Sequence, residues 1–260
     1  MPAAVIKSRP VRDQVSEAEW DKRVNLAACY RLMALYGMTD IIYNHITATV
    51  DGNPNEFLIN AYGMHYEEIT ASSLYKLDVD GNVLLKPYTQ YGILRAGFVI
   101  HSAVHVARPD IDCVIHTHSR AGTAVSCMKQ GLMMVSQTAL NFYDDISYHD
   151  FEGAAGNMSE RDSLAYDLGP KNYNMVLRNH GLIACGRTIQ HAFINILNLE
   201  SACKIQVDLL ASGADVIEPS TEAKENNKEI MTAFRAKNGY EPEWEAMLRR
   251  LDRIDSSFRD

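Results

Sequence analysis

Cysteine is scarce in this chain of 260 residues, and the cysteines that occur are not spaced as pairs. Their number is odd, and no two of them form a C-x-x-C motif. They are Cys29, Cys113, Cys127, Cys185 and Cys203. The pattern argues against a disulfide framework and predicts a reducing compartment, with most of these thiols in apolar surroundings.

Long apolar runs and an excess of basic residues are missing as well. No segment reaches the roughly 18–20 consecutive apolar residues of a membrane-spanning helix. Residues Met1–Arg12 mix basic residues with prolines and lack the apolar centre of a signal peptide. The 33 acidic residues outnumber the 25 basic ones, and the net charge of −8 argues against a general nucleic-acid binder. We therefore expect a cytoplasmic protein without a membrane or nucleic-acid partner.

The sequence does contain ample apolar material for a large core. With 47% apolar residues, the chain is long enough for one large domain or at most two. We predict a flexible N-terminal tail over residues 1–15, a main domain over residues 16–213, and a charged helical extension over residues 214–260.

Helix and strand patterns alternate along the main domain without a regular βαβ period. Ser16 and Glu19 form a capping box, and apolar residues follow at helical spacing as far as Leu35. Strands are predicted over residues 41–50, 57–59, 113–118 and 131–137, and helices over residues 189–211, 224–237 and 242–255. These elements predict an α/β fold with three layers, α/β/α, around a central mixed and largely antiparallel sheet.

Two histidines one residue apart end the predicted strand Cys113–Ser119. Residues i and i+2 of a strand point to the same face, so His116 and His118 would direct both imidazoles at one point. His180, in the segment Asn179-His180-Gly181, is a candidate third ligand. Three neutral imidazoles can hold a divalent metal and leave a coordination position open. The alternative is that each histidine is a hydrogen-bonded residue of the core.

Several further motifs follow one another along the chain in a recognisable order. They are Asn44 after the first helix, Phe57-Leu58-Ile59 with Gly63 behind it, Val79-Asp80-Gly81, the helix His101 to Asp110 with the pattern His-x-x-x-His-x-x-Arg-Pro-Asp, Val114 to His118, and Asn179-His180-Gly181-Leu182. Taken together, this order resembles the class II aldolase/adducin family over about Trp20 to Gly213.

The resemblance implies a fold, an assembly and a cofactor. It implies an α/β/α domain that assembles as a homotetramer with active sites at the subunit interfaces. It also implies one divalent ion on His116, His118 and His180, first of all Zn²⁺, with Mn²⁺, Fe²⁺ or Co²⁺ as alternatives. Such an ion polarises a carbonyl group while a carbon–carbon bond forms or breaks.

The chain departs from the sugar-phosphate aldolases of this family where they carry a Ser-Ser-Glu tripeptide. Arg95-Ala96-Gly97 stands there, so both the general acid/base glutamate and the phosphate-holding serines are missing. The phosphate loop is replaced by a segment that includes Tyr62 and Gly63, and of that site only Asn44 is retained. We therefore expect a substrate other than a sugar phosphate, bound by Asn44, Tyr62 and Gly63.

Arg95 is the residue of interest in that substitution, because a guanidinium prefers planar, bidentate partners such as carboxylates. A carboxylate substrate held by Arg95 is the specific hypothesis, and a surface ion pair is the alternative. Among candidates for the missing acid, we put His149 first, then Tyr148 or Glu152. His101 could face the same cavity, or it could be structural; His45, His65 and His191 are interpreted as structural or surface residues.

The favoured function is a metal-dependent carbon–carbon lyase that acts on a small carboxylated hydroxy, keto or hydroxy-aromatic compound. Decarboxylation is slightly preferred to aldol cleavage, because it tolerates the loss of a strong carboxylate base. The alternative is a non-enzymatic, adducin-like module of cytoskeletal assembly. The three retained histidines, and the lack of the long charged tail of adducins, favour the enzyme.

Overall fold

The computed structural model describes residues 10–50, 53–153, 160–238 and 240–260. In these ranges the strands form one sheet with the order β4-β3-β2-β1-β5-β8-β7-β6. Neighbouring strands are antiparallel except for β6 and β7, which are parallel, so the predicted mixed and largely antiparallel sheet is confirmed. The strands are β1 His45–Val50, β2 Asn53–Ile59, β3 Tyr75–Asp78, β4 Val83–Leu85, β5 Cys113–Thr117, β6 Ser147–His149, β7 Asn174–Leu177 and β8 Gly181–Gly186.

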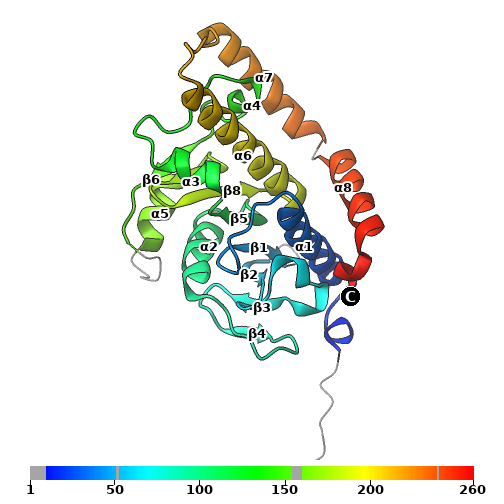
Figure 1. The fold of residues 1–260 in the computed structure, drawn as a ribbon. Coiled ribbons are helices and arrows are strands. Elements are labelled where there is room, and N and C mark those ends of the chain that lie inside the picture. The colour runs from blue at the N-terminus through cyan, green and yellow to red at the C-terminus, as the bar shows by residue number, and fades with distance from the viewer. Residues whose placement is uncertain (1–9, 51–52, 154–159, 239) are drawn as a thin grey trace, which may run out of the picture.

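Helices cover both faces of the sheet, as the three-layer prediction requires (Figure 1). On one face, α2 and α5 pack on the sheet through a cluster that includes Ile100 and Leu164. On the other face, α1, α3 and α6 enclose the larger core around Leu26, Val125 and Phe193. The α-helices are α1 Glu17–Leu35, α2 Arg95–Ala107, α3 Arg120–Ser126, α4 Gln137–Leu140, α5 Glu160–Leu168, α6 Ile189–Ser212, α7 Thr221–Asn238 and α8 Glu241–Ile254.

Two predicted strands differ from the structure. Strand β1 begins at His45 and not at Ile41, because residues 40–43 form a turn closed by a hydrogen bond from Tyr43 N–H to the Asp40 carbonyl. The predicted strand 131–137 is absent from the described sheet. Its backbone donates instead to side chains, from Leu132 N–H to the Tyr148 hydroxyl at 3.0 Å and from Met133 N–H to Gln206 Oε1 at 2.7 Å.

The register of the central strands places the histidines. Strands β1 and β5 pair antiparallel with His45 opposite His116. Strands β5 and β8 pair with Thr117 opposite Leu182, so His180, just before β8, lies beside the end of β5. His116 and His180, which are distant in sequence, therefore meet at one end of the paired strands β5 and β8.

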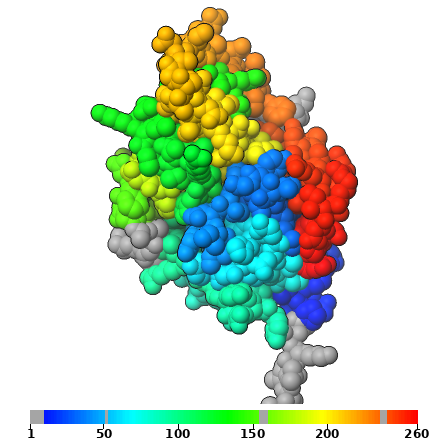
Figure 2. Space-filling model, viewed as in Figure 1, coloured from blue at the N-terminus to red at the C-terminus, as the bar shows by residue number. Residues whose placement is uncertain are grey.

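The C-terminal helices pack on the outside of α1 and α6. Trp244 of α8 is buried, and its Nε1–H donates to Asn25 Oδ1 of α1 at 2.7 Å. Figure 2 shows this red C-terminal segment lying along the blue α1. Of the predicted tail, residues 1–9 lie outside the described residues, and Val11–Gln14 form a 3₁₀ helix with Val11 buried. Among the helices described, none combines the length and apolar character that a membrane span requires.

Candidate metal centre

Three histidines converge at the ends of β5 and β8. The Nε2 atom of His118 lies 2.9 Å from Nε2 of His116 and 2.9 Å from Nε2 of His180. One nitrogen from each ring lies within 4.8 Å of the other two. The predicted ligand set is therefore assembled in space, with its three ring nitrogens directed at a common centre.

The outer ring nitrogens determine which tautomer two of these histidines adopt. Nδ1 of His116 lies 3.0 Å from the Leu182 carbonyl oxygen, an acceptor only. Nδ1 of His118 lies 2.9 Å from Oδ2 of Asp40. Each Nδ1 must therefore carry the hydrogen, and each Nε2 presents a lone pair to the centre. Bare Nε2 atoms at such short separation repel one another unless a cation lies between them, so the donor set fits a divalent metal.

Burial keeps the imidazoles of His116 and His180 neutral, the form that binds metal. Burial, followed by the neighbouring histidines His45, His180 and His118, lowers the pKa of His116 well below its usual range. Burial, with the nearby His118 and His149, lowers the pKa of His180 to about 4. At neutral pH both rings are therefore uncharged ligands.

The backbone around His180 is specialised to bring its ring to the centre. Asn179 adopts a left-handed conformation with φ 57°, which asparagine tolerates better than most residues. A Cβ atom at Gly181 would lie 2.3 Å from the carbonyl oxygen of Thr117, so only glycine allows β8 to approach β5 this closely. The Asn-His-Gly segment is thus a backbone requirement as well as a source of a ligand.

His45 fills the space beside Gly97. A Cβ atom at position 97 would lie 2.6 Å from Cδ2 of the His45 ring. That ring also lies against His116, with centroids 5.1 Å apart. His45, interpreted from the sequence as a structural or surface residue, lies directly beside the three converging histidines.

His101 lies behind His45 and not at the centre itself. Its Nε2 is 2.7 Å from Nδ1 of His45, and its Nδ1 is 2.6 Å from Oγ1 of Thr47. Thr47 Oγ1 is also 2.8 Å from Nε2 of His105. The predicted role of His101 at the cavity is therefore indirect, through the ring of His45.

Of the predicted substrate-binding residues, Tyr62 and Gly63 lie against the segment that leads into α2, whose first residue is Arg95. Tyr62 N–H donates to the Gly92 carbonyl at 2.8 Å, three residues before Arg95, and the ring of Tyr91 packs against Gly63. Asn44 is 2% exposed, and neither polar atom of its side chain has a partner among the described residues. A buried amide without partners is unusual and fits a group that awaits a ligand.

Arg95, the first residue of α2, is exposed. Over the described part of the chain, no carboxylate forms an ion pair with it. Among the described residues, the surface ion pair considered as the alternative is not formed, and binding of a ligand carboxylate by Arg95 stays a prediction.

Tyr148 and His149 make contacts that the sequence did not reveal. The Tyr148 hydroxyl accepts from Leu132 N–H, and the guanidinium of Arg178 lies 4.3 Å from the Tyr148 ring centroid. His149 is 3% exposed, with Nδ1 2.8 Å from Asp167 Oδ2 and Nε2 3.9 Å from Glu160 Oε1. Both side chains are engaged inside this protomer, and their catalytic role stays a prediction.

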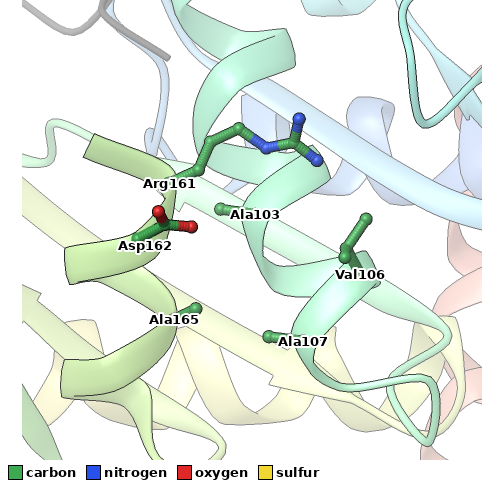
Figure 3. A pocket seen from close by; sticks show the side chains of 6 residues that line it. All are labelled: Ala103, Val106, Ala107, Arg161, Asp162 and Ala165. Carbon is green, nitrogen blue, oxygen red and sulfur yellow. The ribbon is translucent and has the colours of Figure 1, made fainter. Parts of the chain in front are cut away.

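Asp40 is a functional residue that sequence reasoning missed. Its neighbour Ile41 has φ 48°, an uncommon conformation for a β-branched residue, in the turn that directs the carboxylate at His118. No sequence pattern connects Asp40 with a histidine 78 residues away. A separate cavity of about 380 Å³ lies between α2 and α5, where residues such as Ala103 and Arg161 line it (Figure 3). Neither Asp40 nor the three converging histidines belong to its lining.

Comparison with known proteins agrees with this arrangement. The family model of the class II aldolase and adducin N-terminal domain matches residues 24–207. A crystal structure of an aldolase II superfamily protein from Pseudomonas syringae is 44% identical with a TM-score of 0.90, covering 97% of this chain and 100% of that one. Alpha-adducin of Mus musculus is 41% identical over 89% of this chain, which spans 33% of the adducin. An L-fuculose 1-phosphate aldolase from Glaciozyma antarctica PI12 is 25% identical with a TM-score of 0.79, covering 94% of this chain and 93% of that one. The chain belongs to the class II aldolase/adducin family.

Proposed function

We propose that the protein is a divalent-metal-dependent carbon–carbon lyase acting on a small carboxylated hydroxy, keto or hydroxy-aromatic compound. The observation that carries the proposal is the convergence of three imidazoles, two of which, His116 and His118, have their tautomers fixed by Leu182 and Asp40. A Zn²⁺ or similar ion bound there would supply Lewis-acid polarisation of a substrate oxygen. The choice of Zn²⁺ as the first candidate metal is part of the same proposal.

The protein's own residues would bind and orient the substrate. Arg95 is free to hold a carboxylate in bidentate fashion. Asn44 offers a buried donor and acceptor without partners. Gly97 carries no side chain, and the His45 ring fills the space beside it, next to the three histidines. These features favour an acidic substrate over a sugar phosphate.

Decarboxylation is slightly favoured over aldol cleavage within this reaction class. Gly97 provides no carboxylate that could act as a strong base, and decarboxylation requires only one proton to be delivered. His149 remains the first candidate for that donor, with Tyr148 second. His149 is held between Asp167 and Glu160, and it lies near enough to His180 to lower the pKa of that ring. A homotetramer in the cytoplasm is part of the same proposal.

A non-enzymatic, adducin-like interaction module is the second candidate. The 41% identity with Alpha-adducin of Mus musculus supports it. The two functions make opposite demands on the three histidines, because an interaction module needs no open metal site. Metal content therefore distinguishes them before any substrate is known.

The test of the enzyme proposal is a screen of the zinc- and manganese-loaded protein for CO₂ release. The panel comprises small hydroxy, keto and hydroxy-aromatic acids, with cleavage to aldehydes followed in parallel. We expect turnover of at least one acid that disappears in His180→Ala. A protein that binds metal fully yet turns over no member of either panel contradicts the proposed reaction class.

A further inference from the structure

We propose that His45 is a substrate-contacting residue whose bare Nε2 accepts a hydrogen bond from a hydroxyl group of the ligand at the metal centre. The inference rests on the proposed function, since it assumes that a small hydroxy compound occupies the centre. It adds a residue and a substrate feature, a free hydroxyl, to the site.

The position of His45 follows from the pairing of β1 and β5. His45 is directly opposite His116 in the register, so both side chains point to the same face of the sheet. Gly97 supplies the room for the His45 ring because it has no Cβ. Within the described chain, the nitrogens that converge as ligands come from His116, His118 and His180 alone, so His45 stands beside the centre without joining it.

A chain of buried polar groups leads away from His45. Nδ1 of His45 is 2.7 Å from Nε2 of His101. Nδ1 of His101 is 2.6 Å from Thr47 Oγ1, which is 2.8 Å from Nε2 of His105. All four side chains belong to residues that are 3% exposed or less. Water therefore has little access, and the tautomers must satisfy one another.

The direction of the hydrogen-bond chain is decided at Thr47, whose hydroxyl has one hydrogen and can donate to only one of the two imidazoles. The Ile111 backbone acts to raise the pKa of His105, as a hydrogen-bond acceptor does. Because Nε2 faces Thr47, this acceptor belongs to the Nδ1 side of the ring, although without the geometry of a full hydrogen bond. A nitrogen lone pair facing a carbonyl oxygen is repulsive, so Nδ1 of His105 carries the hydrogen. Its Nε2 then accepts from the Thr47 hydroxyl.

The remaining tautomers follow in sequence. Thr47 accepts from Nδ1–H of His101, and Nε2 of His101 accepts from Nδ1–H of His45. Each ring is neutral, because it is buried and no described carboxylate forms a hydrogen bond or ion pair with it. Nε2 of His45 is therefore a bare acceptor, and no described residue donates a hydrogen bond to it. A ligand hydroxyl would satisfy it.

The tautomer of His45 is measurable by long-range ¹H–¹⁵N correlation NMR on the full chain labelled with ¹⁵N-histidine, without and with zinc. The His45 signals are assigned by their loss in His45→Phe. If His45→Phe does not fold, His45→Asn is used in its place. We expect Nδ1 protonated and Nε2 bare in the wild type. Thr47→Val should abolish this fixed tautomer, whereas Thr49→Val, two residues along the same strand, should leave it unchanged. A wild-type His45 with hydrogen on Nε2 overturns the inference.

Ligand contact is tested by adding glycolate to the zinc-loaded protein and, in parallel, methoxyacetate, which lacks the hydroxyl hydrogen. Glycolate, but not methoxyacetate, should shift the His45 Nε2 resonance. Glycolate should also bind about fivefold more weakly to His45→Phe than to the wild type, or to His45→Asn if that variant is used. Equal responses to the two acids overturn the inference. Failure of the proposed function is separate, because it would appear as absence of bound zinc while the tautomer remains readable in the metal-free protein.

Discussion

The His45 ring occupies the space that a side chain at position 97 would need. A Cβ atom on residue 97 would lie 2.6 Å from Cδ2, 2.7 Å from Cγ and 3.0 Å from Nε2 of the His45 ring. Non-bonded carbon atoms prefer separations of about 3.5–4.0 Å. The His45 ring has little freedom to withdraw, because His101 holds its Nδ1 at 2.7 Å. The imidazole of His45 on β1 therefore requires a glycine at position 97 of α2.

Gly97→Ala should therefore destabilise the protein by about 1–3 kcal/mol, the usual cost of overpacking a core. Helix propensity alone predicts the opposite sign, since alanine is the better helix former. The free energy of unfolding in urea measures the effect. His45→Ala should remove the clash, so that Gly97→Ala costs little in that background. Gly92→Ala is the control, because nothing lies within 4 Å of its Cβ position; equal stability of the two single variants would refute the packing account.

Asp40→Asn should weaken zinc binding by about 10- to 100-fold, the usual effect of losing an outer hydrogen-bond partner of a metal ligand. The carboxylate accepts from Nδ1–H of His118 at 2.9 Å, and an amide accepts less strongly. Competition with a chelator of known affinity measures the change. Asp208→Asn on α6 is the control. Unchanged zinc affinity in Asp40→Asn would show that this contact does not support the centre.

The convergence of His116, His118 and His180 was predictable from the sequence. His116 and His118 share a face through strand periodicity, and His180 is found by its place in a motif. His45 and Asp40 were not predictable in this way. Their proximity to the centre depends on the β1–β5 register and on a turn with Ile41 at φ 48°, neither of which leaves a pattern in the sequence.

The fold was predictable to a similar extent. Helices α7 and α8 agree with the predicted ranges 224–237 and 242–255 to within a few residues. The segment 131–137 was predicted as a strand from its apolar residues. Its backbone is instead satisfied by Tyr148 and Gln206, contacts over long sequence separation that local propensity cannot anticipate.

The buried His105 should make the protein lose stability in mild acid. Burial lowers its pKa from 6.5 to about 4 in the folded protein. Between these values the unfolded chain binds more protons, so stability falls as pH decreases from about 6.5 to about 4. His105→Asn should reduce the slope of unfolding free energy against pH by up to about 1.4 kcal/mol per pH unit. The comparison is made by urea unfolding from pH 4 to pH 8, and parallel curves for the two proteins would contradict the prediction.

Arg95→Ala should raise the KM for any acid that the protein turns over by about tenfold or more, with a smaller change in kcat. The guanidinium is exposed and forms no ion pair among the described residues, so its loss should not alter the unfolding free energy. Arg95→Lys should recover part of the affinity, because it keeps the charge but not the bidentate geometry. An unchanged KM in Arg95→Ala would mean that the carboxylate is held elsewhere.

The central claim is that His116, His118 and His180 form a metal site. Its most direct test is elemental analysis of the purified protein after equilibration with excess Zn²⁺ and removal of unbound ion. We predict about one zinc per chain in the wild type and in His65→Ala, a histidine outside the centre, and a large loss in His116→Ala and His180→Ala. A folded wild type that retains neither Zn²⁺ nor Mn²⁺, or histidine variants that retain as much as the wild type, would contradict it.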